Sequence, residues 1–244
     1  MLLLVLLERH RRPTDEPDEP TTLLLVRHGH VADNDAQPAA RLCGWSDPPL
    51  SALGRRQVAW LRWRLHQEAP IAALYTSPLQ RAKYTAQTIA GLLGLRPRRR
   101  HVLREINCGS LDGWPLAEVR RRYPQLWAAN LAQRDETFCW PGGESYRAFR
   151  ARALRAVQGI AAAHSGQRVL IVTHAGVISQ IVGALAGTSA ARWEAFRAGN
   201  ASVTELLWQG DGGRVLRFDD RHHVEHLQHR GSAPPAGVRP ADDP

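Results

Sequence analysis

The sequence is short of the residues that mark several common classes of protein. Its three cysteines, Cys43, Cys108 and Cys139, lie far apart and form no C-x-x-C pair, which argues against a disulfide framework and against a cysteine zinc site. Lysine occurs only at Lys83. The apolar run at the amino terminus, MLLLVLL, is too short to span a bilayer. We therefore expect a cytoplasmic protein without a membrane partner.

The positive charge of the chain comes almost entirely from arginine, and the formal net charge is +9. A basic protein can bind nucleic acid, an acidic membrane surface or a small anionic substrate. The guanidinium group suits planar, two-pronged contacts with phosphate or carboxylate. The densest basic run, residues 96–100, has no aromatic residues interleaved with it, whereas stacking aromatics are typical of nucleic-acid sites. We expect this run to be a solvated connector and nucleic acid not to be a partner.

The two ends of the chain differ in composition from its middle. Residues 1–20 contain a charged, proline-rich stretch and are predicted to be a disordered leader. Residues 231–244 are predicted to be a disordered tail. Residues 21–230 are long enough to form one domain with a true hydrophobic core.

The middle of the chain alternates between strand and helix patterns. Strands are expected at 22–26, 71–75 and 168–173, and an antiparallel pair at 201–208 and 214–218. Helices are expected at 51–68, 77–93, 145–164 and 176–185, with Ser51 and Ser77 as N-cap candidates and Gly94 as a stop. This order predicts a three-layer α/β/α sandwich whose central sheet is mostly parallel, with one antiparallel edge. Ligands of such sheets bind beyond the carboxyl ends of the strands.

Two of the expected strands end in histidine at that edge. LLLVRHG places His28 at the end of the first, and VLIVTHAG places His174 at the end of another. The small residues that follow each histidine let the backbone turn and a ligand approach closely. If the two strands are neighbours, both histidines face one pocket. A lone histidine is usually structural, but this repeated placement, with Arg27 beside His28, favours a functional site.

Four motifs, in this order, are similar to those of the histidine phosphatase superfamily, which has the phosphoglycerate mutase-like fold. They are RHG at 27–29, SPLQRA at 77–82, LREINCGSLDG at 103–113 and THAG at 173–176. The resemblance covers residues 21–227. The WPGGES turn and the compact length after the third motif resemble the phosphatase branch, in particular α-ribazole phosphatases and broad-specificity phosphatases.

The resemblance implies a role for each matching residue. His28 corresponds to the nucleophile that attacks phosphorus and becomes a phosphohistidine, and Glu105 and His174 complete the catalytic set. The implied phosphate-binding residues are Arg27, Arg81, Asn34 and Gly44. A nucleophilic imidazole must be neutral, and a nearby guanidinium disfavours the imidazolium form.

Some positions leave alternatives open. His30 and Val31 stand where the family usually has an acidic residue and then Ser or Thr. We expect His30 and residues 114–140 to shape the substrate pocket. Glu144 either faces this pocket or belongs to a turn that Ser145 caps as the start of a helix. The histidines at 222–229 resemble a zinc cluster in composition, but we interpret them as structural or surface residues.

The resemblance implies a phosphomonoester hydrolase that acts through a phosphohistidine on a small phosphorylated metabolite. Neither a metal nor an organic cofactor is implied. Two alternatives remain, namely phosphoryl transfer of the phosphoglycerate mutase type and non-catalytic binding of a phosphorylated ligand. The oligomeric state is left open.

Overall fold

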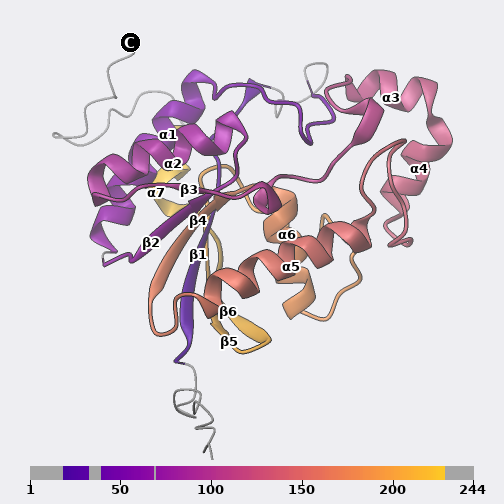
Figure 1. Cartoon of the computed structure of the whole chain (residues 1–244). Coiled ribbons are helices and arrows are strands. Elements are labelled where there is room, and N and C mark those ends of the chain that lie inside the picture. Colours follow the sequence, from indigo (N-terminus) through magenta and orange to yellow (C-terminus); the bar gives the residue numbers. More distant parts are fainter. Residues whose placement is uncertain (1–18, 33–39, 69, 229–244) are drawn as a thin grey trace, which may run out of the picture.

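A computed structural model of the chain describes residues 19–32, 40–68 and 70–228. Its central layer is a six-stranded sheet in the order β3-β2-β4-β1-β5-β6 (Figure 1). The strands are β1 (Thr21–Arg27), β2 (Ala73–Thr76), β3 (Arg98–Arg99), β4 (Arg168–Thr173), β5 (Val203–Gln209) and β6 (Gly212–Asp220). Strands β1 to β4 run parallel, and β5 and β6 form an antiparallel edge. The architecture expected from the sequence is confirmed.

Seven α-helices surround or extend this sheet in the described residues. They are α1 (Ala52–Gln67), α2 (Gln80–Leu93), α3 (Leu116–Arg122), α4 (Pro124–Ala132), α5 (Tyr146–Ala162), α6 (Ala175–Leu185) and α7 (His222–Glu225). Short 3₁₀ helices span His101–Leu103, Gly109–Leu111 and His226–Gln228. Helices α1, α2 and α7 pack on one face and α5 and α6 on the other. Figure 1 shows α3 and α4 set apart from the sheet, beyond the carboxyl ends of its parallel strands.

The apolar run before the first histidine is buried from both sides. Leu23 and Leu25 contact the core under α5 and α6, whereas Leu24 and Val26 contact the core under α1 and α2. All four side chains are completely buried. A strand covered on both faces has to be apolar at every position, as is typical of parallel sheets. This packing holds the end of β1 rigidly at the edge of the sheet.

The helix ends confirm most of the expected signals and correct one. Ser51 and Ser145 each accept a hydrogen bond from the backbone N–H three residues further on. Gly94, with φ of 65°, ends α2 as expected. The prediction that Ser77 caps this helix is wrong, because α2 begins at Gln80 and the hydroxyl of Ser77 lies against His174 instead.

The basic run at 96–100 is also more ordered than expected. Arg98 and Arg99 form the short edge strand β3, which pairs with β2 while both side chains stay exposed. The expected solvation of this run is confirmed, whereas residues 98–99 form a strand rather than a connector. Its backbone completes the sheet and its side chains remain in solvent.

The expected leader and tail lie outside the described residues, except for Glu19 and Pro20. The carbonyl of Glu19 accepts hydrogen bonds from the backbone of Gly166 and the hydroxyl of Ser165. The disorder of both ends therefore stays a prediction. Within the described part of the chain, none of the helices has the length and apolar content that a bilayer span requires.

Candidate active site

Strands β1 and β4 are neighbours, and their carboxyl ends bring two histidines together. Arg27 is in register with Thr173, so His28 and His174 follow at the same level. The centroids of the two rings lie 5.2 Å apart, with the ring planes at 62°. The expected adjacency of the two strands is confirmed, and both imidazoles lie where ligands of parallel sheets bind.

His28 is held so that one ring nitrogen is left for chemistry. Its Nδ1 lies 2.7 Å from the carbonyl oxygen of Gly29. A carbonyl can only accept, so Nδ1 donates and the lone pair resides on Nε2. Burial, together with the charges of Arg81 and Arg27, lowers the pKa of His28 well below the usual 6.5. The ring is therefore neutral at neutral pH.

Two glycines make room for the groups around these histidines. A Cβ atom at Gly29 would lie 2.7 Å from the carbonyl oxygen of Gly54, so the loop after His28 can rest directly on the start of α1. A Cβ atom at Gly176 would lie 2.2 Å from a carboxyl oxygen of Glu105. Packing against backbone therefore requires Gly29, whereas a Cβ atom at Gly176 would displace the carboxyl of Glu105 from its position.

Glu105 is fixed by backbone donors on both of its oxygens. The N–H of Ile106 donates to Oε1 and the N–H of Gly176, at the start of α6, donates to Oε2, each at 2.9 Å. Arg152 donates to the backbone carbonyl of Glu105 and pairs with Glu144 at 2.7 Å. Glu144 therefore supports the segment that carries Glu105, and this carboxyl is held beside the end of β4.

Arg81 lies in the first turn of α2 and is held by the loop that precedes α1. Its Nη1 and Nη2 donate to the carbonyl oxygens of Ser46 and Gly44, both at 2.7 Å. The side chain is only 1% exposed, and among the described residues its Nε has no acceptor. The N–H of Gly44 donates to Asp112. Both backbone groups of Gly44 thus already have partners, and Gly44 holds Arg81 in place.

His174 is completely buried, and its Nε2 lies 2.8 Å from the hydroxyl oxygen of Ser77. That oxygen also accepts from the N–H of Leu79. The other ring nitrogen of His174, Nδ1, is buried and has no partner within the described structure. Burial, followed by the charge of Arg81, lowers the pKa of His174 well below 6.5. A buried ring nitrogen without a partner thus lies on the ring next to His28.

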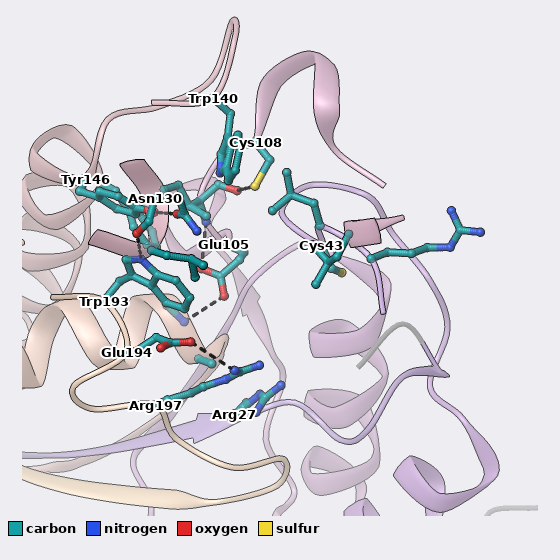
Figure 2. A pocket seen from close by; sticks show the side chains of 18 of the residues that line it. Arg27, Cys43, Glu105, Cys108, Asn130, Trp140, Tyr146, Trp193, Glu194 and Arg197 are labelled. Carbon is teal, nitrogen blue, oxygen red and sulfur yellow. Dashed lines mark hydrogen bonds and ion pairs between the residues drawn. The ribbon is translucent and has the colours of Figure 1, made fainter. Parts of the chain in front are cut away.

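Arg197 is a third arginine at this site, and no motif in the sequence marks it. It lies in the loop between α6 and β5, 3.8 Å from Glu194. Figure 2 shows its guanidinium group beside that of Arg27. Burial, followed by the charge of Arg197, lowers the pKa of Arg27 to about 10. Like charges this close repel each other, and an anion between them would relieve the repulsion.

A cavity of about 370 Å³ opens beside these groups (Figure 2). His28, Arg27, Arg81 and Glu105 line its polar end. Most of the remaining wall is apolar and includes Leu42, Ile106, Leu116, Trp127, Leu131 and Trp193. The expectation that residues 114–140 shape the pocket is confirmed, because α3 and α4 supply much of this wall.

Asn34, His30 and the histidines at 222–229 are not seen among the residues that line the cavity in the described structure. Asn34 falls in the undescribed segment 33–39, so its role stays a prediction. His30 lies 2.8 Å from the hydroxyl of Ser51, and the residues lining the cavity in the described structure do not include it. In residues 19–32, 40–68 and 70–228, no group of three or more His, Cys, Asp or Glu side chains is arranged to hold a metal ion. His222 instead contacts Asp220, at 2.7 Å.

Comparison with known proteins agrees with this geometry. A family model described as histidine phosphatase superfamily (branch 1) matches residues 23–221. A metal-independent phosphoserine phosphatase of Arabidopsis thaliana is 34% identical over 165 residues, which cover 67% of this chain and 68% of the relative.

Two solved structures extend the likeness to the fold. Bacillus stearothermophilus YhfR is 32% identical with a TM-score of 0.77, covering 84% of this chain and 100% of that chain. A mycobacterial glucosyl-3-phosphoglycerate phosphatase is 27% identical with a TM-score of 0.71, covering 82% and 99%. With the family match running from β1 to the end of β6, this chain belongs to the histidine phosphatase superfamily (branch 1) and is a phosphatase of that superfamily.

Proposed function

We propose that this phosphatase hydrolyses small phosphomonoesters through a phosphohistidine on His28, with neither a metal ion nor an organic cofactor. The observation that carries the proposal is the state of His28. Its ring is buried and neutral, with the proton held on Nδ1 by Gly29 and the lone pair left on Nε2. Arg27 and Arg81 lie close enough to lower its pKa. A neutral nucleophile among fixed cations suits attack on an anionic phosphate ester.

In the first step, the lone pair of His28 Nε2 attacks phosphorus and the bond from phosphorus to the alcohol oxygen breaks. Glu105, as the carboxylic acid, donates its proton to the departing oxygen, so the alcohol leaves neutral. The enzyme then carries phosphohistidine and a Glu105 carboxylate. Two backbone N–H groups hold the carboxyl of Glu105 in one orientation.

In the second step, a water molecule attacks phosphorus and the bond from phosphorus to Nε2 breaks. Glu105 accepts the proton of the water, which restores the acid for the next cycle. His28 leaves as the neutral imidazole that began the reaction. Phosphate is then released, and the enzyme returns to its starting state without an external reductant, oxidant or metal.

The charge that develops on the phosphoryl oxygens needs donors that are already in place. Arg27 and Arg81 are the proposed clamp, and the Nε of Arg81 is a buried donor without an acceptor among the described residues. The buried Nδ1 of His174 also has no partner among the described residues, and with the ring proton on Nδ1 it would be a second such donor. Asn34 and Gly44 were predicted to bind phosphate; for Gly44 the contacts support an indirect role through Arg81.

The likeness to named phosphatases supports hydrolysis of a phosphorylated small molecule. A metal-independent phosphoserine phosphatase and a glucosyl-3-phosphoglycerate phosphatase are among the similar proteins. Their substrates differ, so the shared feature is the phosphomonoester group. We also propose a cytoplasmic location, which is supported by the three free cysteines.

The test is a rapid-quench labelling experiment with a ³²P-labelled phosphomonoester in the presence of EDTA. We expect phosphate release that resists EDTA and a protein-bound label that is labile to acid and stable to base, as phosphohistidine is. His28→Asn should lose both signals. The matched control is His101→Asn, since His101 is an exposed histidine away from the cavity.

Each alternative has its own outcome in this experiment. A mutase-type enzyme would take up the label but pass it to an added alcohol rather than to water. A non-catalytic binding protein would take up no label and release no phosphate. Turnover that survives His28→Asn would contradict the phosphohistidine mechanism.

A further inference from the structure

We propose that the alcohol half of the substrate is an apolar, ring-bearing group that docks against the cavity wall formed by Trp127, Leu131 and Trp193. The inference rests on the proposed function, because it assigns the leaving group of that same reaction. It concerns the end of the cavity away from His28. Figure 2 shows that end beside Tyr146 and Trp140, with Arg27 and Arg197 at the other.

The two tryptophans of this wall pack against a small hydrophobic cluster that is separate from the two cores against the sheet. Its buried members include Val119, Phe138 and Trp140, which α3, α4 and the following loop bring together. Trp127 and Trp193 pack against this cluster but are only partly buried, and both line the cavity. The side of the cluster that faces the cavity is therefore partly exposed to solvent. An apolar group placed there would remove more of its surface from water.

Two aromatic residues that line the cavity, Tyr146 and Trp193, have their polar atoms engaged within the protein. The hydroxyl of Tyr146 donates to the side-chain oxygen of Asn130. The indole N–H of Trp193 donates to the backbone carbonyl of Asn130 at 3.5 Å. Both polar atoms are thus engaged by one residue of α4, and these two side chains offer a ligand their ring surface. Such surfaces favour another ring, stacked or edge-on.

The volume of the cavity also favours an alcohol group that carries a ring. Its volume of about 370 Å³ falls within the range of pockets that hold drug-sized ligands, roughly 300–1,000 Å³. A phosphoryl group on a three-carbon alcohol would leave part of this space to water against apolar side chains. A phosphoryl group joined to a ring system fills both ends.

The charged residues of the cavity do not form a cradle for an amino-acid alcohol such as serine. A zwitterion needs separate partners for its ammonium and carboxylate groups. Glu194 and Arg197 are the candidates, but they are paired with each other, and Arg197 lies beside Arg27 at the phosphate end. Arg41 donates to the carbonyl oxygen of Gly113 and is exposed. The wall that remains for the alcohol half is the apolar one.

The test compares 2-phenylethyl phosphate, ethyl phosphate and O-phosphoserine as substrates. All three are alkyl esters, and the ammonium group makes serine the best leaving group among them, so a preference for the ring does not come from leaving-group chemistry. We expect kcat/KM for 2-phenylethyl phosphate to exceed that for ethyl phosphate by about 20-fold, as burial of one phenyl ring predicts. It should exceed that for O-phosphoserine by at least as much.

Two exposed leucines provide a matched pair of variants that leaves the core untouched. Leu131 lines the cavity and is 49% exposed, whereas Leu216 on β6 is 45% exposed and lies away from it. Leu131→Asn should lower kcat/KM for 2-phenylethyl phosphate by about fivefold and narrow its advantage over ethyl phosphate. Leu216→Asn should leave the ratio of the two substrates unchanged. Trp193→Phe should keep the preference, and Trp193→Ala should abolish most of it.

The outcomes separate this inference from the proposed function. If all three esters are hydrolysed and O-phosphoserine is preferred, or if the ring gives no advantage, the inference is overturned while the phosphohistidine mechanism stands. The inference is also overturned if Leu131→Asn and Leu216→Asn behave alike. If none of the esters is hydrolysed, or if His28→Asn remains active, the proposed function itself fails.

Discussion

The two ends of the cavity are built in different ways. The phosphate end consists mainly of buried side chains at the ends of β1 and β4 and in the first turn of α2, together with Glu105. The exposed Arg197 adds a further cation to it. The apolar end consists of α3, α4 and the loop after α6, around a separate hydrophobic cluster. The exposed fraction of Arg81 is 1% at the first end, and that of Leu131 is 49% at the second. In the proposed mechanism, the chemistry is placed on the rigid sheet, and the proposed selectivity is placed on segments that can vary without disturbing it.

This difference has a consequence for mutations. Changes at the phosphate end should affect every phosphomonoester alike, because all substrates share the phosphoryl group. Changes at the apolar end should alter the ranking of substrates. The ratio of kcat/KM for 2-phenylethyl phosphate to that for ethyl phosphate therefore separates the two regions.

The largest effect is expected for Arg81→Gln. This variant removes a cation that Gly44 and Ser46 hold in place. The Nε–H of Arg81 has no acceptor among the described residues. We expect kcat/KM to fall by about 1,000-fold for both esters, with their ratio unchanged. Arg56→Gln, on the exposed side of α1, is the control. A loss confined to the ring-bearing ester would show that the two ends are not independent.

Glu105→Gln should come next, and its effect should depend on the leaving group. The amide keeps the shape of the carboxyl but has no acidic proton to give, so we expect the phosphorylation step with 2-phenylethyl phosphate to slow by about 100-fold. The burst with 2,4-dinitrophenyl phosphate should change far less, because that leaving group needs no proton. Pre-steady-state kinetics measure both. Equal losses with the two esters would argue against an acid role for Glu105.

Arg197→Gln tests the residue that no sequence motif marked. Losing the cation beside Arg27 should raise KM by about tenfold for both esters, with a smaller change in kcat. Arg192→Gln is the matched control, since it is an exposed arginine of the same loop that does not line the cavity. Steady-state kinetics and inhibition by inorganic phosphate provide the readout. An unchanged KM would remove Arg197 from the phosphate end.

The smallest expected effect is the dependence of stability on the protonation of His28, and it is measured on the unmodified enzyme. Because burial and the neighbouring arginines depress the pKa of His28, its ring should stay neutral, with the proton on Nδ1, as the pH falls through 6.5. The unfolded chain takes up this proton near pH 6.5 and the folded chain does not. The free energy of unfolding should therefore decrease as the pH falls below 6.5. Imidazole ¹⁵N shifts, compared with those of His28→Asn, report the ring, and thermal melting reports stability. A ring that titrates at 6.5 in the folded protein would contradict the buried placement.

Much of the phosphate end could be predicted from the sequence because its signals are local. An apolar run that stops at Arg27 and His28, and a second that stops at His174, mark strand ends without any knowledge of the fold. The glycine in each motif is also a local signal. A Cβ atom at Gly29 would meet the backbone of Gly54, and one at Gly176 would meet the carboxyl of Glu105. Alternating strand and helix patterns then predict a parallel sheet and the edge where a ligand binds.

What only the tertiary structure decided depends on contacts between distant residues. Ser77 was expected to cap α2, but it holds His174, which is 97 residues away in the chain. Arg197 carries no local signal and reaches the site because its loop returns beside β1.

The same holds for the short edge strand β3, which forms because β2 offers it a partner. The apolar wall arises where α3 and α4 fold back over the carboxyl edge of the sheet. Local patterns determine where a strand or helix ends, because backbone and side chain compete within a few residues. Which ends meet is decided by the packing of the whole chain around its cores, and here that packing turned two separate histidine motifs into one site.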